Sequence, residues 1–255
     1  MNQFRFRLKE YLKNITPAVY SYSQRSTLFL ILLLFAAAYE TLAGYNSHVE
    51  KLPFLTLSGS IFINYIIYWL KTYFFFLVPY VIIHLLRPSL ANFFYVFFAI
   101  FLLLLQFALI EYFHKSMVPL GADLFAYSID DIKQTVGASG GISLFLIVSV
   151  VTILIVFIFV FWYYPEKIII PKYVVLIVSL FSFVVLTTGF SSPIPATLKT
   201  EYSRTLVLNK SDYFITEAYR HFNRDDEETD IYSDSYSGDF GNKTLLVKDF
   251  NYPDE

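Results

Sequence analysis

The sequence has no cysteine and almost no net charge. Without cysteine the chain forms no disulfide, iron–sulfur cluster or thiolate metal site, and this absence is compatible with either side of a membrane. The 19 lysine and arginine residues stand against 21 aspartate and glutamate residues, giving a net charge of -2. The bulk charge therefore indicates neither nucleic acid nor an anionic surface as a partner.

Charged residues of either sign are also scarce, at 16% of the chain against roughly a quarter in a soluble domain. Hydrophobic residues make up 56% and aromatic residues 20%, and the mean hydropathy is +0.54. Long segments must therefore be apolar on every face, whereas a soluble fold alternates apolar and polar faces. Because the apolar residues lie almost entirely between Ser26 and Phe190, the sequence predicts an all-α integral membrane protein.

Five apolar segments are predicted to cross the membrane, since a helix rises ~1.5 Å per residue and the hydrocarbon core is ~30 Å thick. Only Arg87-Pro88-Ser89 separates the second from the third, so these two must form a tight helical hairpin. Ala36-Ala37-Ala38 in the first segment would suit a signal peptidase, but the basic region before it is long and more spans follow. We therefore predict a transmembrane domain over 26–190, with spans at about 26–44, 61–86, 90–113, 142–164 and 173–190.

Lysine and arginine in the short loops predict the orientation of these spans. The N-terminal segment 1–25 is basic, and Arg87, Lys167 and Lys172 would lie on its side of the membrane. The loops on the opposite side carry only three lysines, two of which sit among aspartates. We expect a multi-pass protein of the inner (cytoplasmic) membrane with a cytoplasmic N-terminus. An odd number of spans then makes the tail, 191–255, extracytoplasmic.

The loop between the third and fourth spans has a helical pattern. Its apolar residues recur every three or four positions while its charged residues face elsewhere, which predicts an amphipathic helix over about 122–136. The helix would either lie on the outer membrane face or cover the outer end of the bundle. The apolar positions are Phe125, Ile129, Ile132 and Val136.

The tail is predicted to have two parts. Ser211 or Asp212 would cap a short juxtamembrane helix. After Asn223 the chain is acidic and rich in turn residues, and too poor in apolar residues to fold alone. This second part is interpreted as a partly disordered linker.

Three polar residues inside the predicted spans form a candidate site, because an ionisable group in a membrane is costly unless paired or solvated. Glu40 and Lys71 both lie ~21–22 Å from the cytoplasmic ends of their helices, so an ion pair between them is geometrically feasible. Gln106 reaches a similar depth on the third span. The cluster would either form a polar floor for a lipid headgroup or fix the register of the helices.

Glu111 and His114 lie one turn apart at the outer end of the third span. Such a pair can bind metal, but two ligands do not complete a site, and an interfacial role without metal is the alternative. The sequence has no Gly-rich phosphate loop, nucleophile elbow or EF-hand spacing. We therefore predict no catalytic, cofactor-binding or metal-binding residue and no complete catalytic site in this chain.

Two stretches resemble bacterial lipoteichoic acid synthase-like sulfatases. Residues 118–127 (VPLGADLFAY) are similar to the loop between the third and fourth spans of that family, and residues 209–214 (NKSDYF) to the segment that leads into its extracytoplasmic domain. The basic N-terminus, five predicted spans and outward tail complete the resemblance, which extends over nearly the whole chain.

The resemblance implies a phosphoglycerol transferase whose catalytic part is a separate alkaline-phosphatase-like domain. In that family the domain follows the linker, binds a divalent metal through carboxylate and histidine ligands, and uses a threonine nucleophile on a phospholipid. Related five-span enzymes transfer phosphoethanolamine to lipid A. None of those catalytic residues has a counterpart here, so the metal is expected only in a downstream domain.

The leading hypothesis is that the chain is the membrane-anchoring portion of such a transferase and holds its catalytic domain at the outer leaflet of the cell envelope. Its expected partners are membrane lipids, including a phospholipid headgroup, and the downstream domain. The alternative is a non-catalytic accessory or scaffold subunit that binds another protein through its outer helix and tail. A small transporter is a third hypothesis, but no inverted repeat is evident.

Overall fold

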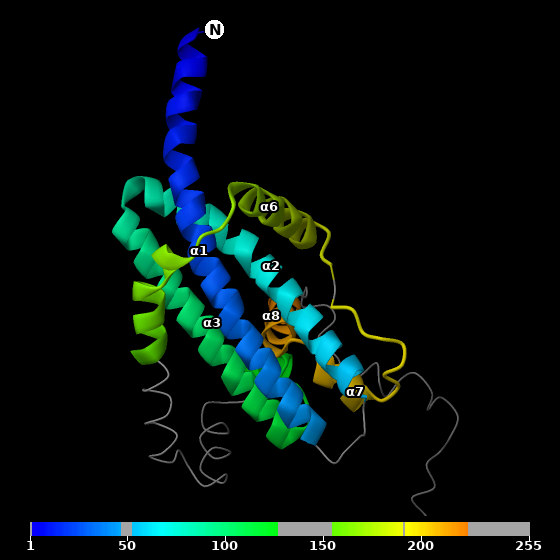
Figure 1. Ribbon diagram of the computed structural model, residues 1–255. Coiled ribbons are helices and arrows are strands. Elements are labelled where there is room, and N and C mark those ends of the chain that lie inside the picture. The colour runs from blue at the N-terminus through cyan, green and yellow to red at the C-terminus, as the bar shows by residue number, and fades with distance from the viewer. Residues whose placement is uncertain (1, 47–52, 127–154, 191, 224–255) are drawn as a thin grey trace, which may run out of the picture.

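A computed structural model describes residues 2–46, 53–126, 155–190 and 192–223 of the protein. Every regular element in these ranges is helical, as the sequence predicts (Figure 1). Residues 155–163 are also helical. The named elements are α1 (Asn2–Asn46), α2 (Phe54–Leu86), α3 (Pro88–Ser116), η1 (Ala122–Ala126), η2 (Pro165–Lys167), α6 (Lys172–Thr187), α7 (Glu201–Val207) and α8 (Lys210–Phe222).

Among the described residues, three helices are long and apolar enough to cross a membrane, which supports a membrane-embedded protein. The candidate spans are Ile15–Tyr45 in α1, all of α2 and all of α3, with 31, 33 and 29 residues. At ~1.5 Å per residue each exceeds the ~30 Å hydrocarbon core. The predicted boundary between a polar segment 1–25 and a first span is not a break in structure, because α1 runs through it as one helix.

The predicted count of five spans is not reached in the described ranges. The segment predicted as the fifth span, 173–190, corresponds to α6, whose 16 residues are shorter than the ~20 that a span needs. Most of the predicted fourth span, 142–164, lies outside the described residues. The predicted amphipathic helix 122–136 is described only at its start, where η1 is a 3-10 helix.

The hairpin between α2 and α3 confirms the expected tight turn. Arg87 alone joins the helices in an extended conformation (φ -155°, ψ 102°), and Pro88 occupies the first position of α3, where its missing N–H is not needed. Met117 ends α3 with a left-handed backbone (φ 60°). We refer to the end of the bundle at Arg87 as the hairpin end.

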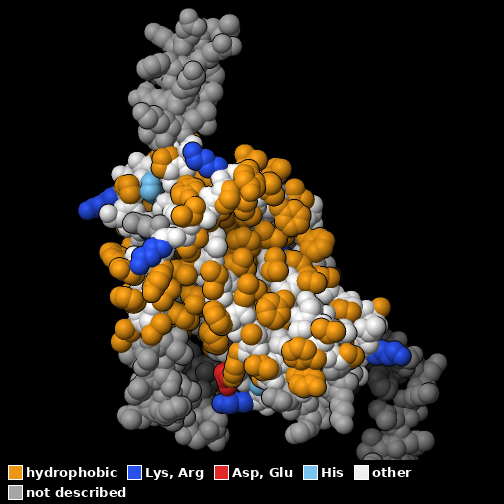
Figure 2. Space-filling model, in the orientation of Figure 1, with side chains coloured by type: hydrophobic (Ala, Val, Ile, Leu, Met, Phe, Trp, Pro, Cys, Tyr) orange, Lys and Arg blue, Asp and Glu red, His pale blue; other side chains and the backbone are white. Residues whose placement is uncertain are grey.

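Helices α1, α2 and α3 lie side by side, and α6 packs against α2 (Figure 1). Small residues such as Ala36 and Ala37 are fully buried and let α1 approach its neighbours closely. The outward faces remain apolar, as expected where they contact lipid (Figure 2). A row on α3 illustrates this, with exposed rings at Phe93, Phe97 and Phe101.

Helices α7 and α8 fold back onto the bundle, at the half away from the hairpin end (Figure 1). Thr200 caps α7 by accepting a hydrogen bond from Ser203 N at 3.1 Å. Asn209 caps α8 by accepting a hydrogen bond from Asp212 N at 2.9 Å, so the predicted cap at Ser211 or Asp212 is wrong by two or three residues. Because α7 and α8 adjoin at Leu208 and Asn209, residue Lys210 enters the bundle at the first turn of α8.

Candidate functional site

A buried lysine from α8 is the centre of the polar cluster. Lys210 is only 2% exposed, and its ammonium lies 2.7 Å from Oε1 of Glu40, which is fully buried on α1. It donates to three backbone carbonyls at 2.8–3.0 Å, those of Thr205, Leu206 and Leu208. Burial lowers the pKa of Lys210, and the neighbouring Glu40 carboxylate opposes that effect.

The Lys210 ammonium also lies over the ring of Phe113, 4.3 Å from its centroid. Phe113 is fully buried on α3, so the cation contacts an aromatic face in a desolvated place. A positive charge in such surroundings is tolerated only when it is paired and its hydrogens are bonded. The contacts of Lys210 meet both conditions.

The second carboxylate oxygen of Glu40 begins a chain of hydrogen bonds through the other helices. Tyr65 on α2 donates to Glu40 Oε2 at 2.5 Å, and Gln106 Nε2 on α3 donates to the Tyr65 hydroxyl at 2.6 Å. Gln106 Oε1 accepts from Ser211 N on α8 at 3.1 Å. Because Ser211 follows Lys210, the contacts close into a ring through α1, α2, α3 and α8. We call Glu40, Tyr65, Gln106, Lys210 and Ser211 the buried ring.

A second ion pair lies at the rim of the buried ring. Lys71 Nζ is 2.7 Å from Asp212 Oδ2, and their side chains are 21% and 16% exposed. The predicted Glu40–Lys71 pair is therefore wrong: Glu40 pairs with Lys210, and Lys71 with Asp212. The prediction failed because it sought partners only inside the apolar segments, whereas both partners come from the tail.

Helix α7 is held to the bundle by one further polar contact. Asn64 is fully buried on α2, and its Nδ2 donates to the Val207 carbonyl at 2.7 Å. Leu206 on α7 packs against Gly44 on α1, where an added Cβ would lie 3.0 Å from Leu206 Cδ1. These contacts position the segment whose carbonyls surround the Lys210 ammonium.

The rim ion pair is partly exposed whereas the pair of Lys210 and Glu40 is buried, so the two pairs should contribute differently to stability. We expect Lys71→Met to lower the free energy of unfolding by about 1 kcal/mol or less, because partly exposed pairs contribute little. Thermal unfolding of the purified protein in detergent measures this. A loss as large as that of Lys210→Met would contradict the assignment of Lys71 to the rim.

An open groove of about 850 Å³ runs beside the rim pair, between α8 and the end of α6. Its lining combines two ion pairs, Lys71–Asp212 and Arg220–Glu217, with apolar side chains such as Leu186 and Ile194. Arg220 is paired on one side with Glu217 at 2.7 Å and remains largely exposed. The groove thus places two ion pairs next to apolar surface.

The predicted pair Glu111 and His114 does not assemble a metal site in the described residues. Glu111 accepts a short hydrogen bond from the Tyr39 hydroxyl on α1. His114 Nε2 is buried and has no hydrogen-bond partner in the described ranges. No group of three histidine or carboxylate ligands occurs in those ranges, so a structural contact between α1 and α3 is what the geometry shows for Glu111.

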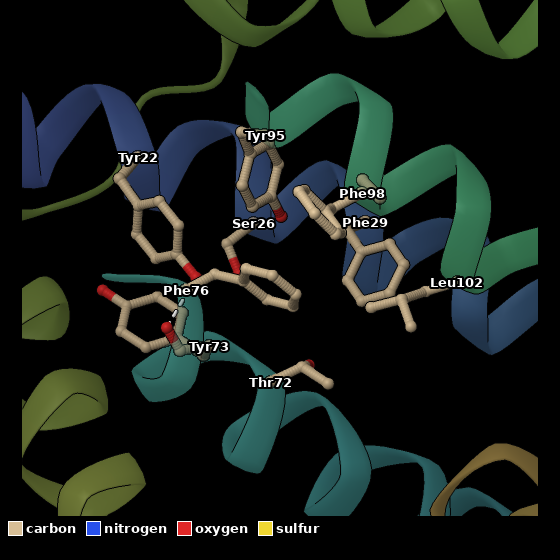
Figure 3. A pocket seen from close by; sticks show the side chains of 10 residues that line it. Tyr22, Ser26, Phe29, Thr72, Tyr73, Phe76, Tyr95, Phe98 and Leu102 are labelled. Atoms are coloured by element: carbon tan, nitrogen blue, oxygen red, sulfur yellow. Dashed lines mark hydrogen bonds between the residues drawn. The ribbon is translucent and has the colours of Figure 1, made fainter. Parts of the chain in front are cut away.

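Towards the hairpin end the bundle interior is packed with tyrosines (Figure 3). Tyr22 on α1 donates to the Tyr73 carbonyl on α2 at 2.5 Å, and its ring meets the ring of Tyr95 on α3 edge to face. The pocket between them has a volume of about 10 Å³, room for about one water molecule. This region holds the three helices together and has no space for a substrate.

The geometry therefore shows that the segment of α7 and α8 is docked onto the three long helices. Sequence reasoning identified Glu40 and Gln106 in the buried ring but missed Tyr65, Lys210 and Ser211. Lys210 and Ser211 lie within the stretch 209–214 that carried the family resemblance. No protein-family model matches the chain, and no curated protein or solved structure matches it either.

Proposed function

We propose that this chain is a membrane anchor that holds the polypeptide after α8 at a fixed position on the outer surface. The observation that carries the proposal is the insertion of Lys210 into the bundle, where it pairs with Glu40. A flexible tether would need no such contact. A buried ion pair with a closed ring of hydrogen bonds instead fixes the direction and height of α8 relative to the membrane.

The proposed parent is a sulfatase-like phosphoglycerol or phosphoethanolamine transferase with five spans, whose catalytic domain this anchor positions at the outer leaflet. Support comes from the stretch 209–214, which resembles that family and which forms the start of the docked helix. A transferase that acts on membrane lipids benefits from a fixed height above the bilayer, because orientation and proximity lower the barrier to reaction. The orientation assumed is the one that the loop lysines and arginines favour.

The groove beside Lys71 is where we propose that the anchor meets a phospholipid headgroup. It lies next to α6, whose outward face is apolar, and it contains the cations Lys71 and Arg220, which a phosphate would share with their partners Asp212 and Glu217. A phosphate can bind such cations while acyl chains stay against the apolar helix. This proposal gives Lys71 a functional role in addition to its pairing with Asp212.

A fusion experiment tests the anchor function. The catalytic domain of a sulfatase-like transferase is joined after Asn223, and turnover of phospholipid is measured in vesicles. We expect phospholipid turnover to be at least roughly tenfold faster than with the same domain on an unrelated single-span anchor. The reason is that a fixed geometry raises the effective concentration of lipid at the catalytic domain. The fusion with Lys210→Met should lose most of this gain at equal membrane insertion. Equal activity of all three fusions would contradict the proposal.

An accessory subunit is the second candidate function, and one observation favours it. On α8, Tyr219 and Phe222 are exposed aromatic residues on a helix held in a fixed position. Exposed aromatic side chains are common at protein interfaces. Stoichiometric co-purification of one partner protein, lost when Tyr219 and Phe222 are replaced by serine, would favour this function over the anchor of a catalytic domain.

A further inference from the structure

The hairpin end contains a buried arginine that no described carboxylate neutralises. Arg25 on α1 is 8% exposed, and its Nη1 donates to the carbonyl and hydroxyl oxygens of Ser21 at 3.2 and 2.6 Å. Its Nε is buried and has no hydrogen-bond partner in the described ranges. None of the ion pairs formed between described residues includes Arg25. Within the part of the chain that the structure describes, the guanidinium therefore keeps an unused donor and a charge that no carboxylate compensates.

Polar groups from all three long helices converge beside Arg25. The Ser21 hydroxyl lies 3.2 Å from the Tyr80 hydroxyl, which donates to Asn92 Oδ1 at 2.7 Å. The ring of His84 stacks on Tyr80, and its buried Nδ1 has no partner among the described residues.

This cluster lies close to the hairpin end of the bundle. Asn92 and Tyr80 are five and seven residues from Arg87 at the hairpin, which corresponds to ~8–11 Å along their helices. The headgroup layer on each side of a bilayer is ~5–8 Å thick, so the cluster borders it. The half-buried residues are Ser21, His84 and Asn92, and hydrogen bonds through Ser21 and Tyr80 connect Asn92 to Arg25.

The buried positive charge of Arg25 favours an anion as the ligand of this cluster. A buried charge is unfavourable unless an opposite charge meets it. The planar guanidinium matches the oxygens of a phosphate and binds them through parallel hydrogen bonds. The hairpin end also carries exposed lysine and arginine side chains around a histidine, at the upper end of Figure 2, which would attract anions.

We infer that Arg25, with Ser21, His84 and Asn92 of its cluster, binds a phosphate group, supplied by a phospholipid headgroup or by free phosphate. Under the predicted orientation the site faces the cytoplasmic leaflet, on the opposite side of the membrane from the anchor surface at α8. The inference is therefore independent of the proposed anchor function. Its ligand would clamp α1 to the α2–α3 hairpin.

The test uses the full chain purified in detergent and measures bound ligand by native mass spectrometry and by the shift of the unfolding midpoint. The ligands are dioleoylphosphatidylglycerol, the phosphate-free lipid dioleoylglycerol, and inorganic phosphate. We expect binding of phosphatidylglycerol and none of dioleoylglycerol. A shift produced by inorganic phosphate alone would identify free phosphate as the source, and a requirement for the lipid would identify the headgroup.

Variants at Arg25 decide the assignment. Arg25→Gln is expected to weaken phosphatidylglycerol or phosphate binding roughly tenfold or more, because it removes charge-assisted hydrogen bonds. Arg25→Lys keeps the charge if the first variant does not fold, and should bind with intermediate affinity. Arg87→Gln removes an exposed charge nearby and should change binding less than about twofold. Unchanged binding in both Arg25 variants, or equal binding of the phosphate-free lipid, would overturn the inference.

Discussion

Lys210→Met is expected to destabilise the protein by about 3–5 kcal/mol, the typical loss when one partner of a buried ion pair is removed. Glu40 would remain fully buried, with Tyr65 still donating to it but no cation beside it. The carbonyls of Thr205, Leu206 and Leu208 would lose their common donor as well. Thermal or denaturant unfolding in detergent measures the change.

A second substitution separates the charge effect from a general packing defect. In the double variant Glu40→Gln, Lys210→Met, no buried charge is left and the glutamine still accepts from Tyr65. Most of the lost stability should therefore return. Arg220→Gln, which breaks an exposed pair with Glu217, should change stability by less than about 1 kcal/mol. A double variant no more stable than Lys210→Met alone would contradict the assigned role of the pair.

Gln106→Leu has the second-largest expected effect, because Gln106 joins the transmembrane helices to α8. Its side chain is fully buried, donates to Tyr65 and accepts from Ser211 N. Leucine would leave the buried Ser211 N–H unpaired, at a loss of about 1–3 kcal/mol. Hydrogen exchange should accelerate in α8 more than in α2 or α3, because α8 is the element that loses its attachment.

Ser116→Ala provides the control for this prediction. Ser116 lies on the same helix, is exposed, and forms only local hydrogen bonds to Tyr112 and Val118. Its removal should leave exchange in α8 unchanged. If Gln106→Leu also left that exchange unchanged, the ring would not hold α8 in place.

Much of the helical framework follows from the sequence because a membrane imposes a simple requirement. Apolar runs that exceed the thickness of the bilayer core must be helical, so the segments that became α2 and α3 are visible from hydropathy alone. The start of α1 cannot be predicted from hydropathy. Polar and basic residues before Ser26 continue the same helix, and Ser23, Gln24 and Arg25 are buried against other helices.

The candidate site could be predicted only in part. Glu40 and Gln106 can be selected from the sequence because polar residues in apolar segments need polar partners. The sequence gives no such reason to select Lys210, because a lysine beyond the last apolar segment is expected to be solvated. Only the structure shows that α7 and α8 return to the bundle and bury it. The predicted cap at Ser211 or Asp212 indicated the start of a helix there but not what that helix contacts.

The central claim is that α8 is fixed to the bundle, and a distance measurement tests it most directly. The chain has no cysteine, so spin labels attach only at Leu42→Cys on α1 and Tyr219→Cys on α8, both exposed positions. Pulsed electron paramagnetic resonance in lipid nanodiscs should give one narrow distance distribution, and a broad one when Lys210→Met is added. A broad distribution with Lys210 in place would contradict the account.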